Sequence, residues 1–180
     1  MTTDGASWNL AAAAPGCQDG DDSPPPAQLA VSPTGVLLEI CAGAPATDMV
    51  PKQAWTSIDW GAHWTLESST GFPGTASPQV GEIPLIGLTS DVAMTTSRDA
   101  WMTVDQDTLY ETHNDGVTWT PAAIPGEFQY AGSYQVLFVN STHGWVLGIQ
   151  GEMFRTIDGV NWTELTVIGP APGATSTPSA

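Results

Sequence analysis

Short runs of β-branched, aromatic and aliphatic residues alternate with turn-forming residues along most of this chain. In the C-terminal third, four such runs are separated by segments that contain Asn, Gly and Asp. Runs of this length between turn residues are typical of β-strands, and no stretch keeps the 3.6-residue period of a helix. The pattern therefore predicts four consecutive strands, at 134–139, 144–148, 152–156 and 162–166.

Two earlier segments repeat this arrangement. The middle segment predicts strands at 92–96, 100–104, 108–112 and 119–120, and the first predicts strands at 29–32, 36–41 and 54–57. A lone strand is expected at 6–12, and the low-complexity segment 169–180 is expected to be disordered. The chain is thus predicted to be all-β, with three four-stranded antiparallel units at approximately 27–70, 85–123 and 132–168.

A short motif ends in Trp near the last strand of each unit. Its Trp residues are 56, 55 and 43 residues apart, and a Gly stands three residues before each of them. Spacings of about 40–50 residues indicate propeller blades or solenoid repeats, and Gly with Asp or Asn suits a tight turn. The motif residues are Asp4, Gly5, Trp8, Ser57, Asp59, Gly61, Trp64, Thr112, Asn114, Gly116, Trp119, Asp158, Gly159 and Trp162.

The motif resembles the Asp box, or BNR repeat, of a β-propeller family that includes sialidases, sortilin-type receptors and photosystem II assembly factors. Residues 57–64 match Ser/Thr-x-Asp-x-Gly-x-x-Trp in full, and 112–119 match with Asn114 in place of Asp. The first and last copies are one residue shorter. The resemblance implies a structural role for the box, at the periphery between the third and fourth strands of a blade. Ligands are then expected on the loops between blades and on the hairpins between second and third strands.

Three blades and one strand are fewer than the four to eight blades that close a propeller. We therefore expect self-association, or a larger parent chain that completes the ring, because open blades leave apolar faces and strand edges. The lone strand 6–12 would be the outer strand of a preceding blade.

Composition narrows the function. The formal net charge is −16, with 19 acidic residues against Lys52, Arg98 and Arg155. Nucleic acid is a poor partner for such a surface, and no apolar run approaches the roughly 20 residues of a membrane-spanning helix. The sialidases of the family clamp their substrate with three arginines, so two arginines argue against sialidase activity by this chain alone.

Four groups of residues are candidates for chemistry or binding. Asp105, Asp107 and Glu127 fall on loops where a carboxylate pair could hydrolyse a glycosidic bond. Asp19, Asp21 and Asp22 could bind Ca²⁺, although they lack the full ligand pattern of a calcium loop. The two cysteines, at 17 and 41, could form one disulfide in an exported protein, but their spacing does not establish proximity. Trp60, Tyr130 and Tyr134 could stack on sugar rings.

The sequence therefore favours a non-catalytic binding or assembly module, with inter-blade loops that meet a protein or glycan. The alternative is a fragment of a secreted glycoside hydrolase. No cofactor is expected apart from the candidate Ca²⁺. The scarcity of Lys, the abundance of Thr and Trp, and the Pro/Ser/Thr tail favour export from a bacterium, although the chain shows no signal peptide.

Overall fold

The computed structural model describes residues 6, 12–17, 27–45, 47, 49–71, 79–105, 108–125, 134–148 and 151–165. Its strands pair antiparallel and in chain order, forming three four-stranded sheets. One 3₁₀ turn, η1 (Pro15–Cys17), precedes them. Within these ranges no helix has the length and apolar character needed to cross a bilayer.

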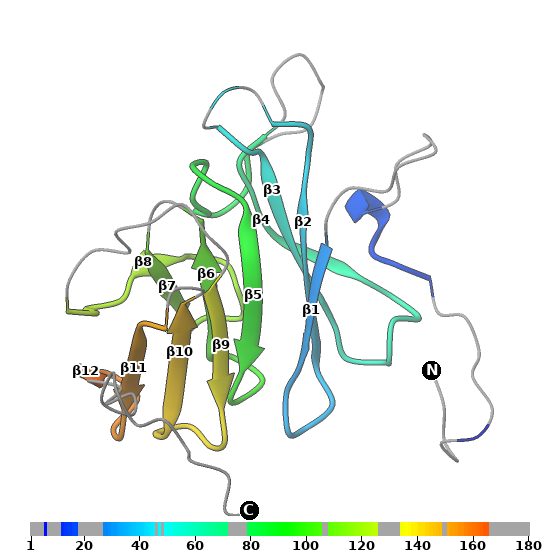
Figure 1. The fold of residues 1–180 in the computed structure, drawn as a ribbon. Helices are drawn as coiled ribbons and strands as arrows, with labels where there is room; N and C mark the ends of the chain where they lie inside the picture. The colour runs from blue at the N-terminus through cyan, green and yellow to red at the C-terminus, as the bar shows by residue number, and fades with distance from the viewer. Residues whose placement is uncertain are drawn as a thin grey trace, which may run out of the picture.

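Each sheet is an up-and-down meander (Figure 1). The first contains β1 (Ala27–Val31), β2 (Leu37–Ala42), β3 (Lys52–Ser57) and β4 (Thr65–Ser69). The second contains β5 (Thr89–Met94), β6 (Ala100–Val104), β7 (Leu109–Thr112) and β8 (Thr120–Pro121). The third contains β9 (Tyr134–Phe138), β10 (Gly144–Gly148), β11 (Met153–Thr156) and β12 (Trp162–Leu165).

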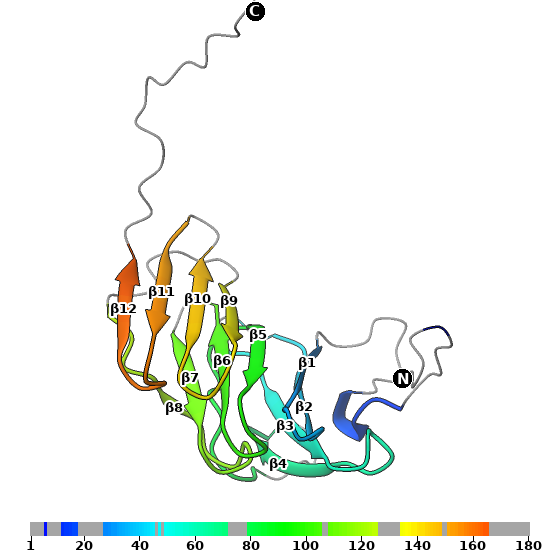
Figure 2. The ribbon, with the colours of Figure 1, turned by 90° about the horizontal axis from the view of Figure 1, so that it is seen from below.

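The sheets stack through their first strands. β1 packs against β5, and β5 packs against β9, so that these strands lie side by side while the later strands spread outwards (Figure 2). Neighbouring sheets that meet at their first strands are the blades of a propeller. The predicted fold class is therefore confirmed, as an all-β, incomplete propeller whose described residues form three blades.

Two apolar layers hold the stack together. Leu38 and Ile40 of the first sheet pack against Met102 and Val104 of the second, and all four are almost fully buried. Trp101 faces the opposite way, into a second layer with the third sheet, where its ring centroid lies 4.2 Å from that of Phe138. Alternate residues of β6 thus face alternate layers, as the twofold period of a strand requires.

β5 begins at Thr89, three residues earlier than the sequence predicted. Its first residues include Asp91, which is unfavourable in a strand by propensity. The structure gives this carboxylate a role between sheets, because Asp91 Oδ2 accepts a hydrogen bond from the Val136 amide at 3.0 Å. Thr103 Oγ1 makes a second link of this kind, donating to the Tyr134 carbonyl at 2.9 Å.

The turns that join the last two strands of each sheet share one hydrogen-bond pattern. In the first, Ser57 Oγ donates to Asp59 Oδ1 at 2.9 Å and accepts from the Gly61 amide at 2.8 Å. Thr112 with Asn114, and Thr156 with Asp158, make the corresponding side-chain bonds at 2.9 and 3.1 Å. The carboxylate or amide oxygen then accepts from backbone amides further along the turn.

The backbone conformation shows where the two longer turns place the residue that the third turn lacks. Each longer turn has two successive residues with positive φ, Trp60 with Gly61 and Asp115 with Gly116, whereas the shorter turn has Gly159 alone. The extra residue thus occupies the left-handed region, which costs a non-glycine residue free energy.

The outer face of the first sheet is covered by residues 12–17. Cys17 forms a disulfide with Cys41 of β2, and Ala14 is fully buried. The Ala14 amide donates to Glu39 Oε2 at 2.9 Å, and Trp64 Nε1 donates to the Ala12 carbonyl at 3.3 Å. The disulfide that the sequence left open is therefore present. Most of the strand predicted at 6–12, and all of the tail 169–180, lie outside the described residues.

Candidate functional site

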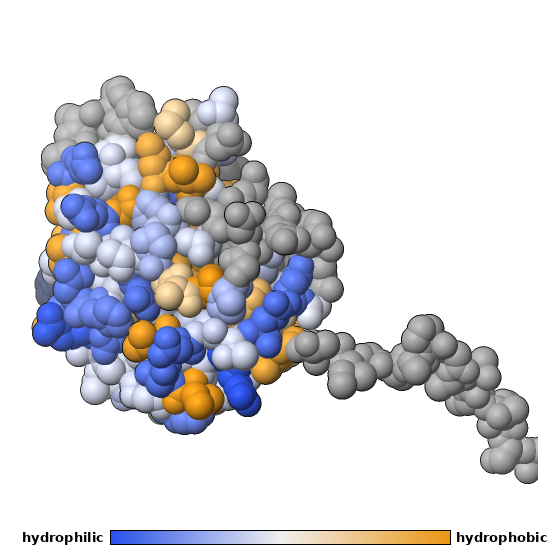
Figure 3. Space-filling model, turned by 90° about the vertical axis from the view of Figure 1, so that its left-hand side faces the viewer, coloured by the Kyte–Doolittle hydropathy of each residue, from blue (hydrophilic) through white to orange (hydrophobic). Residues whose placement is uncertain are grey.

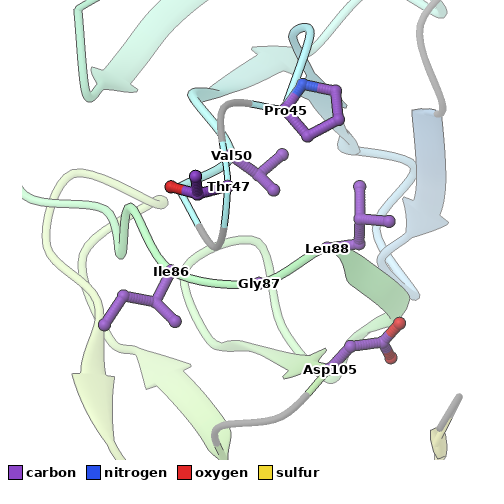
Figure 4. Close-up of a pocket in the computed structure, with 7 residues that line it drawn as sticks. All are labelled: Pro45, Thr47, Val50, Ile86, Gly87, Leu88 and Asp105. Carbon is purple, nitrogen blue, oxygen red and sulfur yellow. The ribbon is translucent and has the colours of Figure 1, made fainter. Parts of the chain in front are cut away.

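A small pocket opens where loops of the first and second sheets meet. Its cavity volume is about 110 Å³. The segment 86–88 crosses between the Thr47–Val50 loop on one side and Asp105 on the other (Figure 4). The lining residues are Pro45, Thr47, Val50, Ile86, Gly87, Leu88 and Asp105.

Three chain segments build this pocket. One is the connection between β2 and β3, the second is the linker between the first two sheets, and the third is the hairpin between β6 and β7. The Val50 amide donates to the Leu85 carbonyl at 2.7 Å, and the Asp105 amide donates to the Leu88 carbonyl at 2.8 Å. The linker is therefore hydrogen-bonded to both flanking segments, which fixes the shape of the pocket.

The side chain of Lys52 binds the same linker through hydrogen bonds to its carbonyl groups. This side chain is fully buried, and its Nζ lies 2.5–3.2 Å from the carbonyl oxygens of Val50, Pro84, Ile86 and Gly87. An ammonium has three N–H donors, so it can serve three of these four acceptors at once. Burial of a charge is tolerated only with such a set of partners. Lys52 thus ties the first sheet to the floor of the pocket.

Asp105 is the charged residue of the pocket lining. Its carboxylate accepts a hydrogen bond from Ser90 Oγ. Gly87 has a φ of +66°, and a Cβ at this position would lie 2.2 Å from the Asp105 carbonyl oxygen. Only glycine therefore permits this close approach of the linker to the hairpin.

A wider groove lies at the other end of these two sheets, with a cavity volume of about 810 Å³. Three carboxylates line it, and each already has a partner in the protein. Glu67 accepts from Thr56 Oγ1 at 2.6 Å, and Asp115 lies 3.4 Å from Arg98 Nε. The third is Asp59. The lining residues are Thr34, Val36, Thr56, Ser57, Ile58, Asp59, His63, Thr65, Glu67, Ser97 and Asp115.

Asp59 is held ionised by its turn. Hydrogen bonds from the His63 side chain and backbone amide lower its pKa to about 2, with a smaller contribution from Ser57. Asp158 occupies the same position in the third turn, and bonds from the Asn161 side chain and backbone lower its pKa well below the usual range. Neither carboxyl suits a general acid, which must keep its proton near the working pH.

A further titratable cluster surrounds His113 at the edge of the second sheet. His113 Nδ1 lies 2.9 Å from Asp99 and its Nε2 lies 3.9 Å from Glu111. Partial burial opposes ionisation of Asp99, but hydrogen bonds from Thr96 and His113 outweigh it and lower its pKa. Desolvation raises the pKa of Glu111. The cluster lies outside both cavities.

Of the predicted catalytic residues, the structure places Asp105 in the small pocket. Asp107 and Glu127 lie outside the described residues, as do the calcium candidates Asp19, Asp21 and Asp22 and the first-motif residues Asp4, Gly5 and Trp8. Among the described residues, no group of three His, Cys, Asp or Glu side chains is placed to hold a metal ion.

The aromatic residues that were predicted to stack on sugars differ in their exposure. Trp60 is 55% exposed, whereas Tyr134 is 2% exposed within the apolar layer between the second and third sheets. The expectation that Tyr134 could stack on a sugar is therefore wrong, because this residue begins β9 and its ring faces the second sheet. Tyr130 lies outside the described residues.

The sequence did not single out Lys52 or the apolar lining of the pocket. A single Lys after Pro51 is predicted to lie on the surface, because Lys is almost never fully buried without partners. The only hint in the sequence that Lys52 has a special role is that the chain has just three Lys and Arg residues. The carbonyls that surround it come from a linker 32–35 residues away, and this proximity follows from the stacking of sheets.

On the side of the stack that carries β8 and β12, the described surface mixes hydrophobic and hydrophilic residues (Figure 3). Figure 3 views the molecule from the side of β8 and β12, where hydrophobic residues form separate patches among hydrophilic ones. Scattered apolar residues of this kind are normal on protein surfaces. The pocket and the groove are two concave features that the described residues offer for binding.

No protein-family model and no curated protein matches the chain. Among solved structures, it is similar to YCF48 from Cyanidioschyzon merolae, with 15% identity, a TM-score of 0.47, and coverage of 77% of this chain and 39% of that one. A structure of YCF48 bound to D1 peptide gives 15% identity, a TM-score of 0.45 and coverage of 76% and 39%.

A Penicillium chrysogenum alpha-L-arabinanase complexed with arabinobiose gives 17% identity, a TM-score of 0.47 and coverage of 77% and 47%. The chain thus spans less than half the length of each of these structures. Similarities this distant transfer no activity, so the function must be argued from the chain's own pocket and groove.

Proposed function

We propose that this chain is a non-catalytic binding module that takes one side chain of a partner protein into the pocket between the first two sheets. The observation that carries the proposal is the pocket itself: a volume of about 110 Å³, an apolar lining and one carboxylate. Cavities for whole small-molecule ligands are usually about 300–1,000 Å³. A cavity of this size suits a single aliphatic side chain.

The charge and the apolar residues of the pocket lining indicate which residues the partner segment should contain. Asp105 stands beside the apolar residues Ile86 and Leu88, and the chain carries a net charge of −16. Such a charge accelerates association with a basic surface and disfavours an acidic one. We therefore expect an aliphatic residue next to Lys or Arg in the partner segment.

Rigidity supports binding without catalysis. The linker that floors the pocket is held by Lys52 and by backbone bonds on both sides, so little ordering is needed when a partner binds. A glycosidase would need two carboxyl groups about 5–10 Å apart across the substrate, and among the described residues Asp105 is the one that supplies a carboxyl to this pocket.

The wide groove keeps glycoside hydrolysis as a second candidate function. Its volume of about 810 Å³ is large enough for a sugar, and Asp59, Glu67 and Asp115 line it. The low pKa of Asp59 favours a permanently ionised group, which can bind hydroxyls or a cation, and Asp115 already pairs with Arg98. A hydrolase here would need Glu67 as its acid.

A peptide-display selection tests the proposal. A random twelve-residue library is selected on the wild-type chain, and the recovered peptides are titrated against variants by fluorescence anisotropy. We expect Ile86→Asp and Asp105→Asn each to weaken binding at least tenfold. Ile157→Asp is a matched control, because Ile157 is 60% exposed and Ile86 is 51% exposed, and it should bind as the wild type does.

Two results would contradict the proposal. Peptides that bind both pocket variants with wild-type affinity would place the site elsewhere. Turnover of neutral polysaccharides that is abolished by Glu67→Gln and kept by Asp105→Asn would favour the hydrolase in the groove.

We also propose that the protein works in an oxidising compartment outside the bacterial cytoplasm. The proposal is supported by the Cys17–Cys41 bond, which leaves no free cysteine, because disulfides persist mainly in exported proteins. Thiol labelling of cell fractions would test it, with unreacted cysteines expected before reduction and reactive thiols in untreated cells as the contrary result.

A further inference from the structure

The two ends of the stack of sheets are covered differently. The outer face of the first sheet lies under residues 12–17, with Ala14 and Cys17 buried against Cys41. No described residues cover the outer face of the third sheet in the same way, and Leu137 and Leu147 are 62% and 40% exposed there. One end face is thus capped, and the other is open in the described part of the chain.

The open face combines apolar residues with the polar Gln135, Arg155 and Thr163, and its described strand residues include no carboxylate. By strand register, Trp145 lies between Leu137 of β9 and Arg155 of β11. Leu147 and Met153 pair beside them. Residues of this parity on the third sheet include Arg155 and no acidic side chain, in a chain with 19 acidic residues. This face is therefore the place where a second copy of so acidic a chain can approach with least repulsion.

Comparison with the second sheet indicates what packs on a face of this kind. Trp145 is the second residue of β10, as Trp101 is the second residue of β6. Trp101 is 2% exposed because the third sheet packs over it. Trp145, at the equivalent position of the next sheet, is only partly buried. The open face thus has the form of a surface that receives a further sheet.

The capped face has the complementary form. In the second sheet, the side that faces its predecessor is formed by alternate residues of β6 such as Met102. In the first sheet, the side that would face a predecessor carries Leu37, Glu39 and Cys41, which alternate with the inward-facing Leu38 and Ile40. This is the face that residues 12–17 cover. Its one carboxylate, Glu39, is held by the Ala14 amide.

We propose that residues 12–17 form a redox-held cap, and that its release lets the third sheet of one copy dock on the first sheet of the next. Apolar residues of both faces would stack as the sheets within one chain do. Arg155 of one copy would meet Glu39 of the next, so the two faces are also complementary in charge. The bond persists in an oxidising compartment unless a dithiol reductant acts there; that reductant would transfer two electrons and two protons to Cys17 and Cys41, giving two thiols and leaving the reductant as a disulfide.

The arrangement predicts head-to-tail assembly, because the two docking faces differ. A heterologous contact of this kind propagates unless it closes into a ring. With the disulfide intact, each copy offers an open face and finds no receiving face. The cap thus acts as the terminal unit that repeat proteins need to stay soluble.

Sedimentation velocity of the full chain tests the proposal, at several concentrations, with and without dithiothreitol. The oxidised protein should sediment as a monomer of 18.8 kDa, and the reduced protein should form a series of multiples that grows with concentration. Near-ultraviolet circular dichroism checks that the sheets survive reduction. Where they do not, Ala14→Gln displaces the cap while the disulfide stays closed, and this oxidised variant should assemble.

A stopper variant tests the direction of assembly. Leu147→Glu removes the open face and keeps the receiving face, so an excess of it should shorten assemblies of reduced wild-type chain. Ile157→Glu, at an exposed residue of the third turn, is the control and should change nothing. A monomer after cap release, equal association in both redox states, or assemblies that Leu147→Glu leaves unchanged would each overturn the proposal.

Discussion

Replacing Lys52 by Met tests whether the buried ammonium holds the pocket together. Met keeps much of the side-chain volume and removes the charge and its three donors. The carbonyls of Val50, Pro84, Ile86 and Gly87 lie within 2.5–3.2 Å of Nζ, so up to three charge-assisted hydrogen bonds are lost. Each such bond contributes about 1.5–3 kcal/mol.

The net effect is smaller than the sum of these bonds, because Met avoids the cost of burying an ammonium. The change leaves up to three buried carbonyls without a donor, and each buried acceptor left unsatisfied costs about 1–3 kcal/mol. We therefore expect Lys52→Met to lower the free energy of unfolding by about 3–5 kcal/mol. Arg155→Met is the control, and a change within about 0.5 kcal/mol is expected for that exposed residue.

Urea titration followed by Trp fluorescence measures the change. The midpoint should fall with an unchanged slope, since the same surface is exposed on unfolding. Hydrogen exchange adds a local readout: the Val50 and Asp105 amides, which bond to the linker, should lose protection. A loss of less than 1 kcal/mol, or unchanged exchange at both amides, would refute the role assigned to Lys52.

Three further predictions follow. Reduction of Cys17–Cys41, whose separation is 24 residues, should lower unfolding free energy by about 3.5 kcal/mol if chain entropy dominates, and calorimetry that finds no fall in Tm would contradict it. The pKa of Asp59 is depressed to about 2, so the contribution of this carboxylate to stability is present above pH about 4 and is lost as the pH falls towards 2. The unfolding free energy of Asp59→Asn, measured between pH about 4 and about 2, should therefore fall less than that of the wild type. An equal fall in the two proteins would contradict this prediction. Because Asp115 and Gly116 both have positive φ, Asp115→Gly should be neutral or stabilising and Gly116→Ala should cost about 1–2 kcal/mol, with thermal unfolding showing the difference in sign.

The sheets were predictable from sequence because their signals are local. Alternating apolar residues placed β10 at 144–148, as predicted, and the Asn-Asp-Gly and Asp-Gly turns separated the last two strands of the second and third sheets. Strand ends were less accurate where a polar residue bonds to another sheet. The start of β5 is the example, because Asp91 looks like a turn residue until its bond to Val136 is known.

The pocket was predictable only in outline. The resemblance to Asp-box propellers indicated loops between blades, and the pocket lies among such loops. The buried state of Lys52 could not be predicted, because its acceptors are carbonyls that every residue carries and that only the fold brings together. The cap at 12–17 was missed for a similar reason. Ala-Pro-Gly sequences carry no strand or helix period, and their burial depends on the disulfide and on the Glu39 contact.

The most direct test of the central claim is hydrogen exchange of the chain with and without a peptide recovered from the display selection. If a partner side chain enters the pocket, protection should rise at the Val50 and Asp105 amides, which flank the 84–88 linker. The His63 amide, at the wide groove, should exchange at an unchanged rate. Protection at the groove with no change at Val50 and Asp105 would contradict the account.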